Sequence, residues 1–396
     1  MIAGTSNSGT GGRVRTRRVH YFSGFDPRGA AYYHRLYRDE AKKQALLNHS
    51  RVHVGKRQRR NDFVSVWQIS SEWHGESTTT DYQFMHWDDL VRDNWQRNSV
   101  LLWSRGLLPY LKLFTCGYWL RIRSVSKSAA MSGAFPIILL LLVSLIAILA
   151  AGTTVFFALS LNFPLWISII LVFIINILIF KIGFSISEKL GGHWVLRTIL
   201  FVSDWACGHQ WEFECRLSEF VKHIIIEQRC NPVDEVLLVG HSIGTMVAVD
   251  VAAQLSAKYY EEINAMKLLT LGHCIPMLSF MPGAEIFRVV LKSLASTKSI
   301  PWMDVTIPPD PLCFYSVNPV ELTWPHLHDH CGPKLAVARV FRMFEKQTYS
   351  KLRWNKLRLH FQYLMASELP VDYDFFLITA GPKFLHESLE RCEIHG

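Results

Sequence analysis

The residues best suited to chemistry lie in a short glycine-flanked segment near the middle of the chain. Residues 240–244 read Gly-His-Ser-Ile-Gly, a G-x-S-x-G pattern with Ser242 at its centre. An apolar run at 236–239 precedes the pattern, and a segment with small and apolar residues, among them Ala248, Ala252 and Ala253, follows it. This order predicts a buried strand, a sharp turn and then a helix over 242–260. The segment therefore predicts a nucleophilic serine exposed on a turn.

The two glycines have a steric role in this prediction. Gly240 and Gly244 leave room where a side chain would collide with the turn or with a neighbouring strand. The start of the following helix directs N–H groups toward a reacting carbonyl oxygen, so the N–H of Ile243 is the expected first oxyanion donor. With His241 beside Ser242, the segment resembles the nucleophile elbow of the α/β-hydrolase superfamily. The similarity extends over about 19–70 and 195–370 and is concentrated around Ser242.

The resemblance implies an acid that follows Ser242 in the chain and a histidine that follows the acid. Asp310 comes shortly after a predicted strand at 302–306, in an Asp-Pro-apolar step that resembles the acid loop of many lipases. Asp304 is the alternative acid, but it lies inside that predicted strand. We therefore expect Asp310 to be the acid of a catalytic triad.

A serine hydroxyl is a poor nucleophile until a histidine takes its proton. His360 lies about 50 residues after Asp310 in an apolar segment. Its His-x-x-Tyr pattern resembles the terminal histidine loop of class 3-type lipases, so His360 is the expected base. His328 and His330 are the alternatives.

Alternate histidines at 326, 328 and 330 would face one side of a strand and could hold zinc. Because no second ligand cluster with defined spacing accompanies them, the ordinary interpretation is a polar loop. We expect neither a metal nor a cofactor.

The second oxyanion donor of such enzymes comes from the loop after an early strand. Residues 19–29 read as the end of a strand followed by Ser-Gly-Phe and Asp-Pro-Arg-Gly, which makes the N–H of Phe25 the candidate. The segment departs from the HGGG signature of lipases. A plain turn is the alternative, because Asp-Pro and Gly favour turns anyway. Arg28 is expected to form a surface salt bridge, or else to contact an anionic substrate group.

Strand and helix patterns alternate in the second half of the chain. An amphipathic stretch at 194–228 precedes the strand at 236–239, and another strand is predicted at 268–271. The first half holds predicted strands at 19–25 and 63–70, with a helical stretch at 30–48 between them. Such alternation indicates an α/β fold with a mostly parallel sheet flanked by helices, here of the α/β-hydrolase type.

The sheet-forming parts are separated by a long apolar segment. Residues 128–180 form a run without any charged residue or histidine. This run is long enough for two bilayer spans of about 20 residues each. Asn162 and Pro164 interrupt the run, so we expect a hairpin of transmembrane helices at 134–160 and 165–183. The expected division is a flexible basic tail at 1–18, sheet-forming parts at 19–127 and 185–396, and the hairpin at 128–184.

The residues that flank the hairpin indicate its orientation. Basic residues lie on both flanks and none lies in the turn, which places both ends in the cytoplasm by the positive-inside rule. The Met1–Gly12 end lacks the apolar core of a signal peptide, and together with the short hairpin loop this is typical of a bacterial inner-membrane protein. The aromatic-rich stretch at 107–120 fits either an interfacial helix or an ordinary core helix.

The net charge of +9 fits a nucleic acid, an anionic membrane or neither. The densest basic runs, at 13–18 and 56–60, show no aromatic interleaving and no nucleic-acid-binding module, so we expect no nucleic-acid partner. Anionic lipid and plain solvated charge are equally good explanations.

The chain is thus expected to be a membrane-anchored serine hydrolase, an esterase or lipase that acts on a lipophilic or lipid ester. The alternatives are an acyltransferase or amidase with the same triad, and a non-catalytic membrane scaffold.

Overall fold

The computed structural model describes residues 12–393, and a nine-stranded, mostly parallel sheet forms the centre of this part of the chain. Its order is β2-β4-β5-β1-β6-β7-β8-β9, with β3 paired to β4. The strands are β1 (Thr16–Phe22), β2 (Arg51–Val54), β3 (Gln58–Asn61), β4 (Val64–Trp73), β5 (Glu76–Met85), β6 (Glu235–His241), β7 (Met266–Leu271), β8 (Trp302–Thr306) and β9 (Lys334–Val337).

Strand β1 lies between β5 and β6 and runs parallel to both. Strands β6 to β9 continue the parallel part, whereas β2, β3 and β4 join antiparallel. The register places Phe22 beside Gly240. Because the carboxyl ends of parallel strands share one edge of the sheet, the loop after β1 lies next to Ser242.

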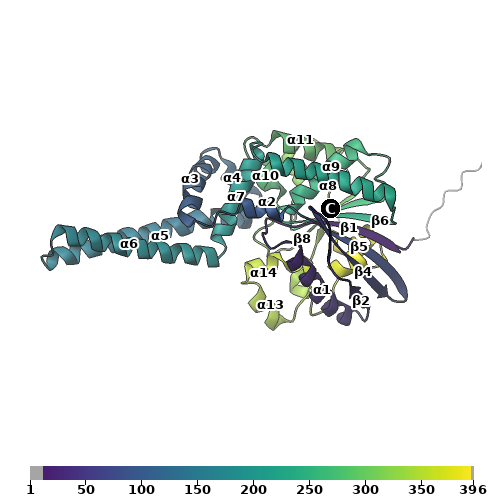
Figure 1. The fold of residues 1–396 in the computed structure, drawn as a ribbon, viewed down its shortest axis with the longest axis horizontal. Coiled ribbons are helices and arrows are strands. Elements are labelled where there is room, and N and C mark those ends of the chain that lie inside the picture. The colour runs from purple at the N-terminus through teal and green to yellow at the C-terminus, as the bar shows by residue number, and fades with distance from the viewer. Residues whose placement is uncertain (1–11, 394–396) are drawn as a thin grey trace, which may run out of the picture.

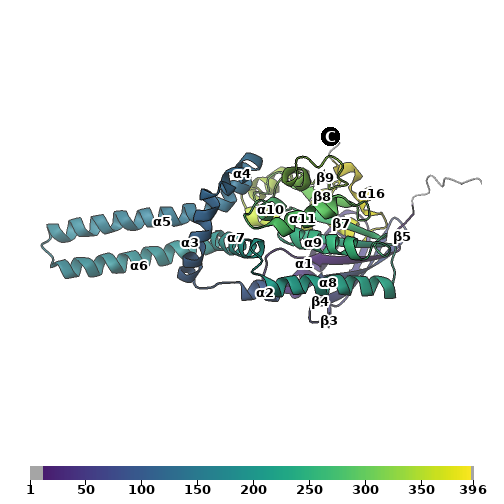
Figure 2. The same cartoon turned by 90° about the horizontal axis from the view of Figure 1, so that it is seen from above.

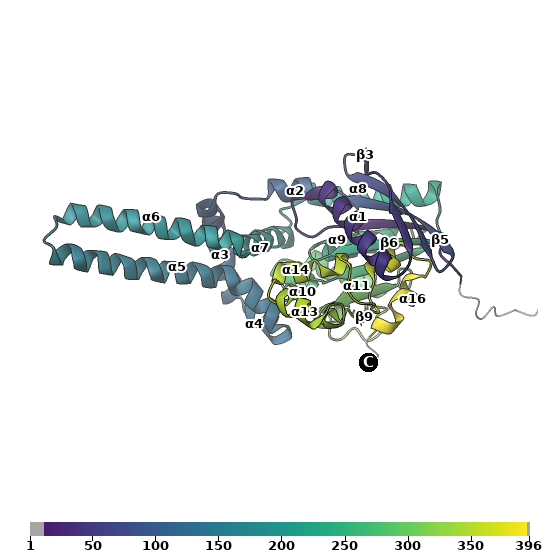
Figure 3. The ribbon, with the colours of Figure 1, turned by 90° about the horizontal axis from the view of Figure 1, so that it is seen from below.

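Helices cover both faces of the sheet (Figures 1 and 3). Along β6, Val236 and Leu238 join the core beneath α8, α9 and α11, whereas Leu237 and Val239 join the core beneath α1, α15 and α16. The strand is apolar from Val236 to Val239 because it is buried on both sides. The helices are α1 (Gly29–Leu47), α2 (Asp88–Asp93), α3 (Ser99–Thr115), α4 (Tyr118–Val125), α5 (Lys127–Ser160), α6 (Leu165–Lys189), α7 (Gly192–Ala206), α8 (Trp211–Cys230), α9 (Gly244–Lys258), α10 (Ile275–Ser279), α11 (Glu285–Ala295), α12 (Pro319–Thr323), α13 (Lys346–Leu352), α14 (Lys356–His360), α15 (Phe375–Ala380) and α16 (Leu385–Leu389).

Helices α5 and α6 lie side by side and project away from the sheet (Figures 1 and 2). They have 34 and 25 residues, and an 18-residue window in each has a mean hydropathy of 2.9 and 2.7, with little of the window buried. Both are therefore long and apolar enough to cross a membrane. The break falls where it was predicted, with Asn162 at a φ of 53° before Pro164. The helices extend beyond the predicted bounds, back to Lys127 and on to Lys189, because their inner turns pack on neighbouring helices.

The predicted boundary after residue 18 is wrong, because β1 already begins at Thr16. Arg17 is fully buried, and its guanidinium lies 2.7 Å from the carboxylate of Glu235. Arg18 is buried as well, near Asp81 and Glu227. Acidic partners more than 60 residues away in the chain make these arginines part of the core, so they do not form a flexible basic tail. The rest of that predicted tail, at 1–11, lies outside the described residues.

Other predicted elements differ in extent. The strand predicted at 19–25 ends at Phe22, which leaves Phe25 in a loop. The basic loop predicted at 56–60 includes the start of β3. The stretch at 107–120 is divided between α3 and α4 at Gly117, which has a φ of 71°. The amphipathic stretch at 194–228 forms two helices, α7 and α8.

Candidate active site

Ser242 occupies the turn between β6 and α9 and has a φ of 58°, a backbone conformation that non-glycine residues adopt rarely. A Cβ on Gly240 would lie 2.5 Å from the carbonyl oxygen of Gly244. A Cβ on Gly244 would lie 2.2 Å from the carbonyl oxygen of Phe22. Neither contact is possible for a real side chain, so this tight turn requires glycine at both positions.

Asp310 and His360 form a buried pair. The Nδ1 of His360 lies 2.8 Å from Oδ2 of Asp310, which also accepts from the hydroxyl of Tyr363 at 3.2 Å, while Oδ1 accepts from the N–H of Leu312. Burial alone would raise the pKa of Asp310, but the charge and hydrogen bonds of its partners, chiefly His360, lower that pKa below its ordinary value. The carboxylate is therefore held ionised against the imidazole.

Two contacts connect this pair to the serine turn. The Nε2 of His241 lies 2.8 Å from the carbonyl oxygen of His360, and the two rings are 5.0 Å apart. The thiol of Cys274, just after β7, lies 3.9 Å from Oγ of Ser242 and 3.2 Å from the carbonyl oxygen of Leu312. Within residues 12–393, the Ser242 hydroxyl makes no hydrogen bond to the His360 ring.

His241 has its own role in this arrangement. Burial, reinforced by the charge of His360, lowers the pKa of His241 to about 3, so its ring is neutral. A carbonyl oxygen can only accept, so the proton of His241 must reside on Nε2. The residue before Ser242 thus holds the backbone at His360, the last residue of α14.

The loop after β1 reaches the serine as predicted. A Cβ built on Gly24 would lie 3.1 Å from Cβ of Ser242 and 3.4 Å from its Oγ. In the described part of the chain, the N–H groups of Phe25 and Ile243 donate no hydrogen bond. The Phe25 side chain is packed between aromatic rings, which fixes the loop. Two free N–H groups therefore flank the serine turn.

The alternative acid lies in a different environment. Asp304 is within β8, with Oδ1 2.5 Å from the hydroxyl of Thr270 and Oδ2 3.7 Å from Nε2 of His273. Burial raises the pKa of Asp304, and these partners only partly oppose that effect. Asp304 is thus not joined to His360.

The alternative histidines lie away from Asp310. His326 and His328 are exposed, and His330 lies 3.2 Å from Glu321 near β9. Across residues 12–393, no three His, Cys, Asp or Glu side chains are grouped to hold a metal ion. Arg28 forms the expected ion pair, 2.6 Å from the Asp26 carboxylate, and lies over the rings of Tyr32 and Phe361.

The apolar hairpin adjoins the loops of this site. Its first turns place the hydroxyl of Ser132 2.8 Å from the carbonyl oxygen of Pro311, next to Asp310. The indole N–H of Trp194, on α7, donates to the carbonyl oxygen of Phe25 at 2.9 Å. The carboxyl-end edge of the parallel strands therefore faces the hairpin (Figures 1 and 2).

Sequence reasoning did not assign Ser132, Trp194 or Cys274 to the site. The position of Cys274 carried a signal, because it closely follows the predicted strand at 268–271, and loops after adjacent parallel strands converge. The contacts of Ser132 and Trp194 carried none, because they depend on how the hairpin packs.

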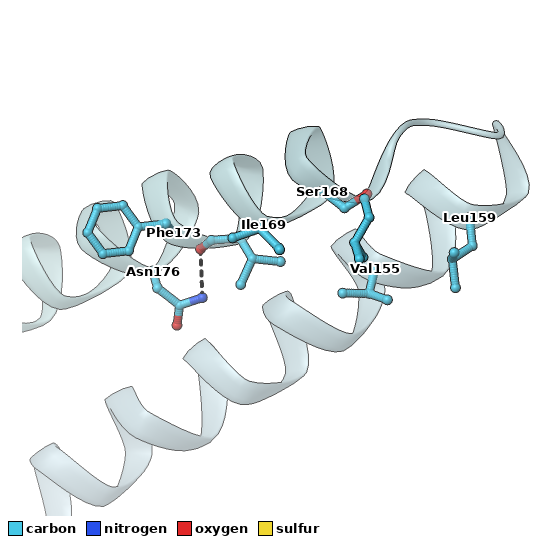
Figure 4. A pocket seen from close by; sticks show the side chains of 8 residues that line it. Val155, Leu159, Ser168, Ile169, Phe173 and Asn176 are labelled. Carbon is cyan, nitrogen blue, oxygen red and sulfur yellow. Dashed lines mark hydrogen bonds between the residues drawn. The ribbon is translucent and has the colours of Figure 1, made fainter.

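A groove between α5 and α6 is lined by apolar residues together with Ser168 and Asn176 (Figure 4). The amide of Asn176 donates to the carbonyl oxygen of Val172 within its own helix. This groove lies near the far end of the hairpin and is separate from Ser242.

In comparisons with known proteins, no family model, no curated protein and no solved structure matches this chain.

Proposed function

We propose that this chain is a membrane-anchored serine hydrolase of the α/β-hydrolase type that cleaves lipophilic esters. The observation that carries the proposal is the position of Ser242, strained on a strand–turn–helix beside the buried Asp310–His360 pair. A strained backbone conformation persists only where the surrounding structure holds it in place. Such strain clusters at functional sites. The sheet order, with β1 between β5 and β6, supports it further.

The proposed reaction has two steps. After rotation of Ser242, Nε2 of His360 takes the Oγ proton, and Oγ attacks the ester carbonyl carbon. Asp310 holds the His360 ring through Nδ1 and stabilises its positive charge. The N–H groups of Ile243 and Phe25 stabilise the oxyanion.

The tetrahedral intermediate then collapses, the bond between the former carbonyl carbon and the alkoxy oxygen breaks, and the alcohol leaves with the proton from His360. Water, deprotonated by His360, attacks the acyl-enzyme in the second step. Serine is thereby regenerated and the carboxylic acid is released. Long or misaligned contacts before substrate binding are common in such sites, so the present Ser242 rotamer is compatible with the proposal.

A lipophilic substrate is proposed because α5 and α6 fit a membrane and their base adjoins the acid and oxyanion loops. The basic flanks of the hairpin favour a cytoplasmic position for the sheet domain. An ester held near the headgroup layer would need to move only a short distance to reach Ser242.

The experiment is fluorophosphonate labelling of the detergent-solubilised protein, beside Ser242→Ala, His360→Gln and Asp310→Asn. The matched control is Ser279→Ala, since Ser279 is a buried serine of α10 that lies outside the turn and whose hydroxyl contacts that of Thr323. We expect the wild-type protein and Ser279→Ala to be labelled and Ser242→Ala to remain unlabelled.

A folded wild-type protein that does not label would overturn the proposal in favour of a non-catalytic membrane scaffold. If the protein labels, its turnover of esters is then measured with added amines or alcohols. This separates a hydrolase from an acyltransferase and an amidase. Transfer of the acyl group to these nucleophiles in preference to water would identify an acyltransferase. Faster turnover of amide than of ester substrates would identify an amidase.

A further inference from the structure

Helix α3 carries two apolar faces, although a helix at the surface of a soluble domain ordinarily has one. One face is buried and packs toward α5 and α7, with Gly106 against Leu196. The other face is open: Leu108 is 66% exposed and Leu111 is 51% exposed. The open face comprises Val100, Leu101, Leu107, Leu108 and Leu111. Positions 100 and 107, and 101 and 108, are seven residues apart, and 107 and 111 are four apart. This spacing aligns the five side chains as one stripe along the helix.

The position of α3 relates this stripe to the hairpin. The helix lies across the end of the hairpin nearest the sheet (Figures 1 and 2). The hydroxyl of Tyr110 donates to the carbonyl oxygen of Gly133 at 2.8 Å. Apart from Met131, the exposed large apolar side chains of α5 begin at Ile138, five residues beyond Gly133. At 1.5 Å per residue this is about 8 Å, so α3 lies just outside the apolar part of the hairpin.

The charged residues on α3 and α4 are basic, and one acidic residue of α7, Asp204, lies 4.0 Å from the guanidinium of Arg105. Arg105 and Lys112 are exposed on α3, and Arg121 and Arg123 are exposed on α4. Among these helices, α3 and α4 contain no acidic residue. An apolar stripe bordered mainly by cations matches the boundary where acyl chains meet anionic headgroups. A second protein surface would need acidic groups to match these cations.

We propose that the open face of α3 is a lipid-contact surface that lies in the headgroup–acyl boundary of the bilayer crossed by α5 and α6. The partner is a phospholipid bilayer with anionic headgroups, which Arg105 and Lys112 contact. This helix would fix the depth of the sheet domain at the membrane. The proposal rests on the proposed membrane spans and is independent of the chemistry at Ser242.

The test is site-specific photo-crosslinking of the full chain in phosphatidylcholine–phosphatidylglycerol vesicles whose acyl chains carry an alkyne. Benzoylphenylalanine replaces Leu108 or Leu111 in turn. Leu145, in the middle of α5, is the positive control. Val289, which is 61% exposed on α11, is the matched negative control. We expect the lipid adduct at 108 and 111 to exceed that at 289 by about tenfold or more.

Adducts at 145 but only background at 108 and 111 would contradict the lipid-contact surface while leaving the spans intact. A crosslink from 108 to a second copy of the chain would assign the face to self-association and would also overturn the proposal. Background labelling at 145 would remove the membrane premise itself. None of these outcomes depends on fluorophosphonate labelling, so the enzymatic proposal is judged separately.

Discussion

Asp310–His360 and Asp304–His273 are both buried Asp–His pairs, and they differ in geometry. Asp310 and His360 are joined by a 2.8 Å contact, whereas Asp304 and His273 are 3.7 Å apart. Partners lower the pKa of Asp310 despite its burial, whereas burial raises the pKa of Asp304. The difference teaches that burial near a histidine does not by itself keep a carboxylate ionised. A carboxylate must receive enough hydrogen bonds to remain ionised.

The location of the two carboxylates explains the difference. Asp310 lies in the loop beyond β8, where a backbone N–H and two side chains can surround it. Asp304 lies within β8, where neighbouring backbone groups are engaged in the sheet, and its Oδ2 makes no hydrogen bond within residues 12–393. The sheet thus restricts the partners of Asp304.

The largest expected difference comes from replacing each of the two histidines with glutamine. His360→Gln removes the proposed base, so kcat for ester hydrolysis should fall by about 10⁴-fold or more. His273→Gln retains an amide that can donate to the carbonyl oxygen of Val317, as Nε2 of His273 can. Its kcat should remain within about tenfold of wild type. Steady-state rates on a short-chain ester measure both, and equal losses would show that the two pairs are not functionally distinct.

The carboxylates should differ nearly as much. Asp310→Asn leaves the shape of the loop but removes the charge that orients and stabilises the His360 cation, which should cost about 10⁴-fold in kcat. Asp304→Asn should change kcat less than about threefold, since an uncharged group suits that site already. Rates are normalised to the folded fraction. A large loss in Asp304→Asn alone would reassign the acid.

The pH dependence of stability should have opposite signs at the two carboxylates. The folded pKa of Asp310 is lowered from 3.8, so its contribution is present above about pH 4 and is lost as pH falls through that folded pKa. The folded pKa of Asp304 is raised from 3.8, so its contribution is present below about pH 4 and is lost as pH rises through that pKa.

Thermal unfolding of the detergent-solubilised variants between pH 3 and pH 8 measures this contrast. Relative to wild type, Asp304→Asn should gain Tm by a few degrees as pH rises above about 4. Asp310→Asn should show a constant deficit above about pH 5 that shrinks in acid. Parallel curves for the two variants would indicate that both carboxylates have the same ionisation state.

The smallest expected effect comes from the hydroxyl groups that support each carboxylate. Tyr363→Phe removes the 3.2 Å contact to Asp310, and kcat should fall by about three- to tenfold. Thr270→Val removes the contact to Asp304 and should lower Tm with kcat unchanged per folded molecule. Active-site titration with a fluorophosphonate provides the folded concentration. Loss of kcat in Thr270→Val would connect Asp304 to catalysis.

The sequence by itself determined the local features, because each depends on neighbours in the chain. The Gly240–Gly244 pattern after an apolar run predicted the strand, turn and helix around Ser242, and the uncharged run predicted the two helices of the hairpin. The strand at 302–306 was predicted with its observed bounds. The pairing of Asp310 with His360 came from a resemblance, and the contact between them agrees with that expectation.

Only the tertiary structure decided the contacts between distant segments. The burial of Arg17 depends on Glu235, 218 positions away, so the local basic run was misleading. The contact of His241 with the His360 backbone and the position of Cys274 beside Ser242 likewise depend on how parallel strands are ordered in the sheet. Hydrophobic periodicity specifies which face of an element is buried, but not which element covers it. The packing of the hairpin base against the acid loop therefore had to come from the fold.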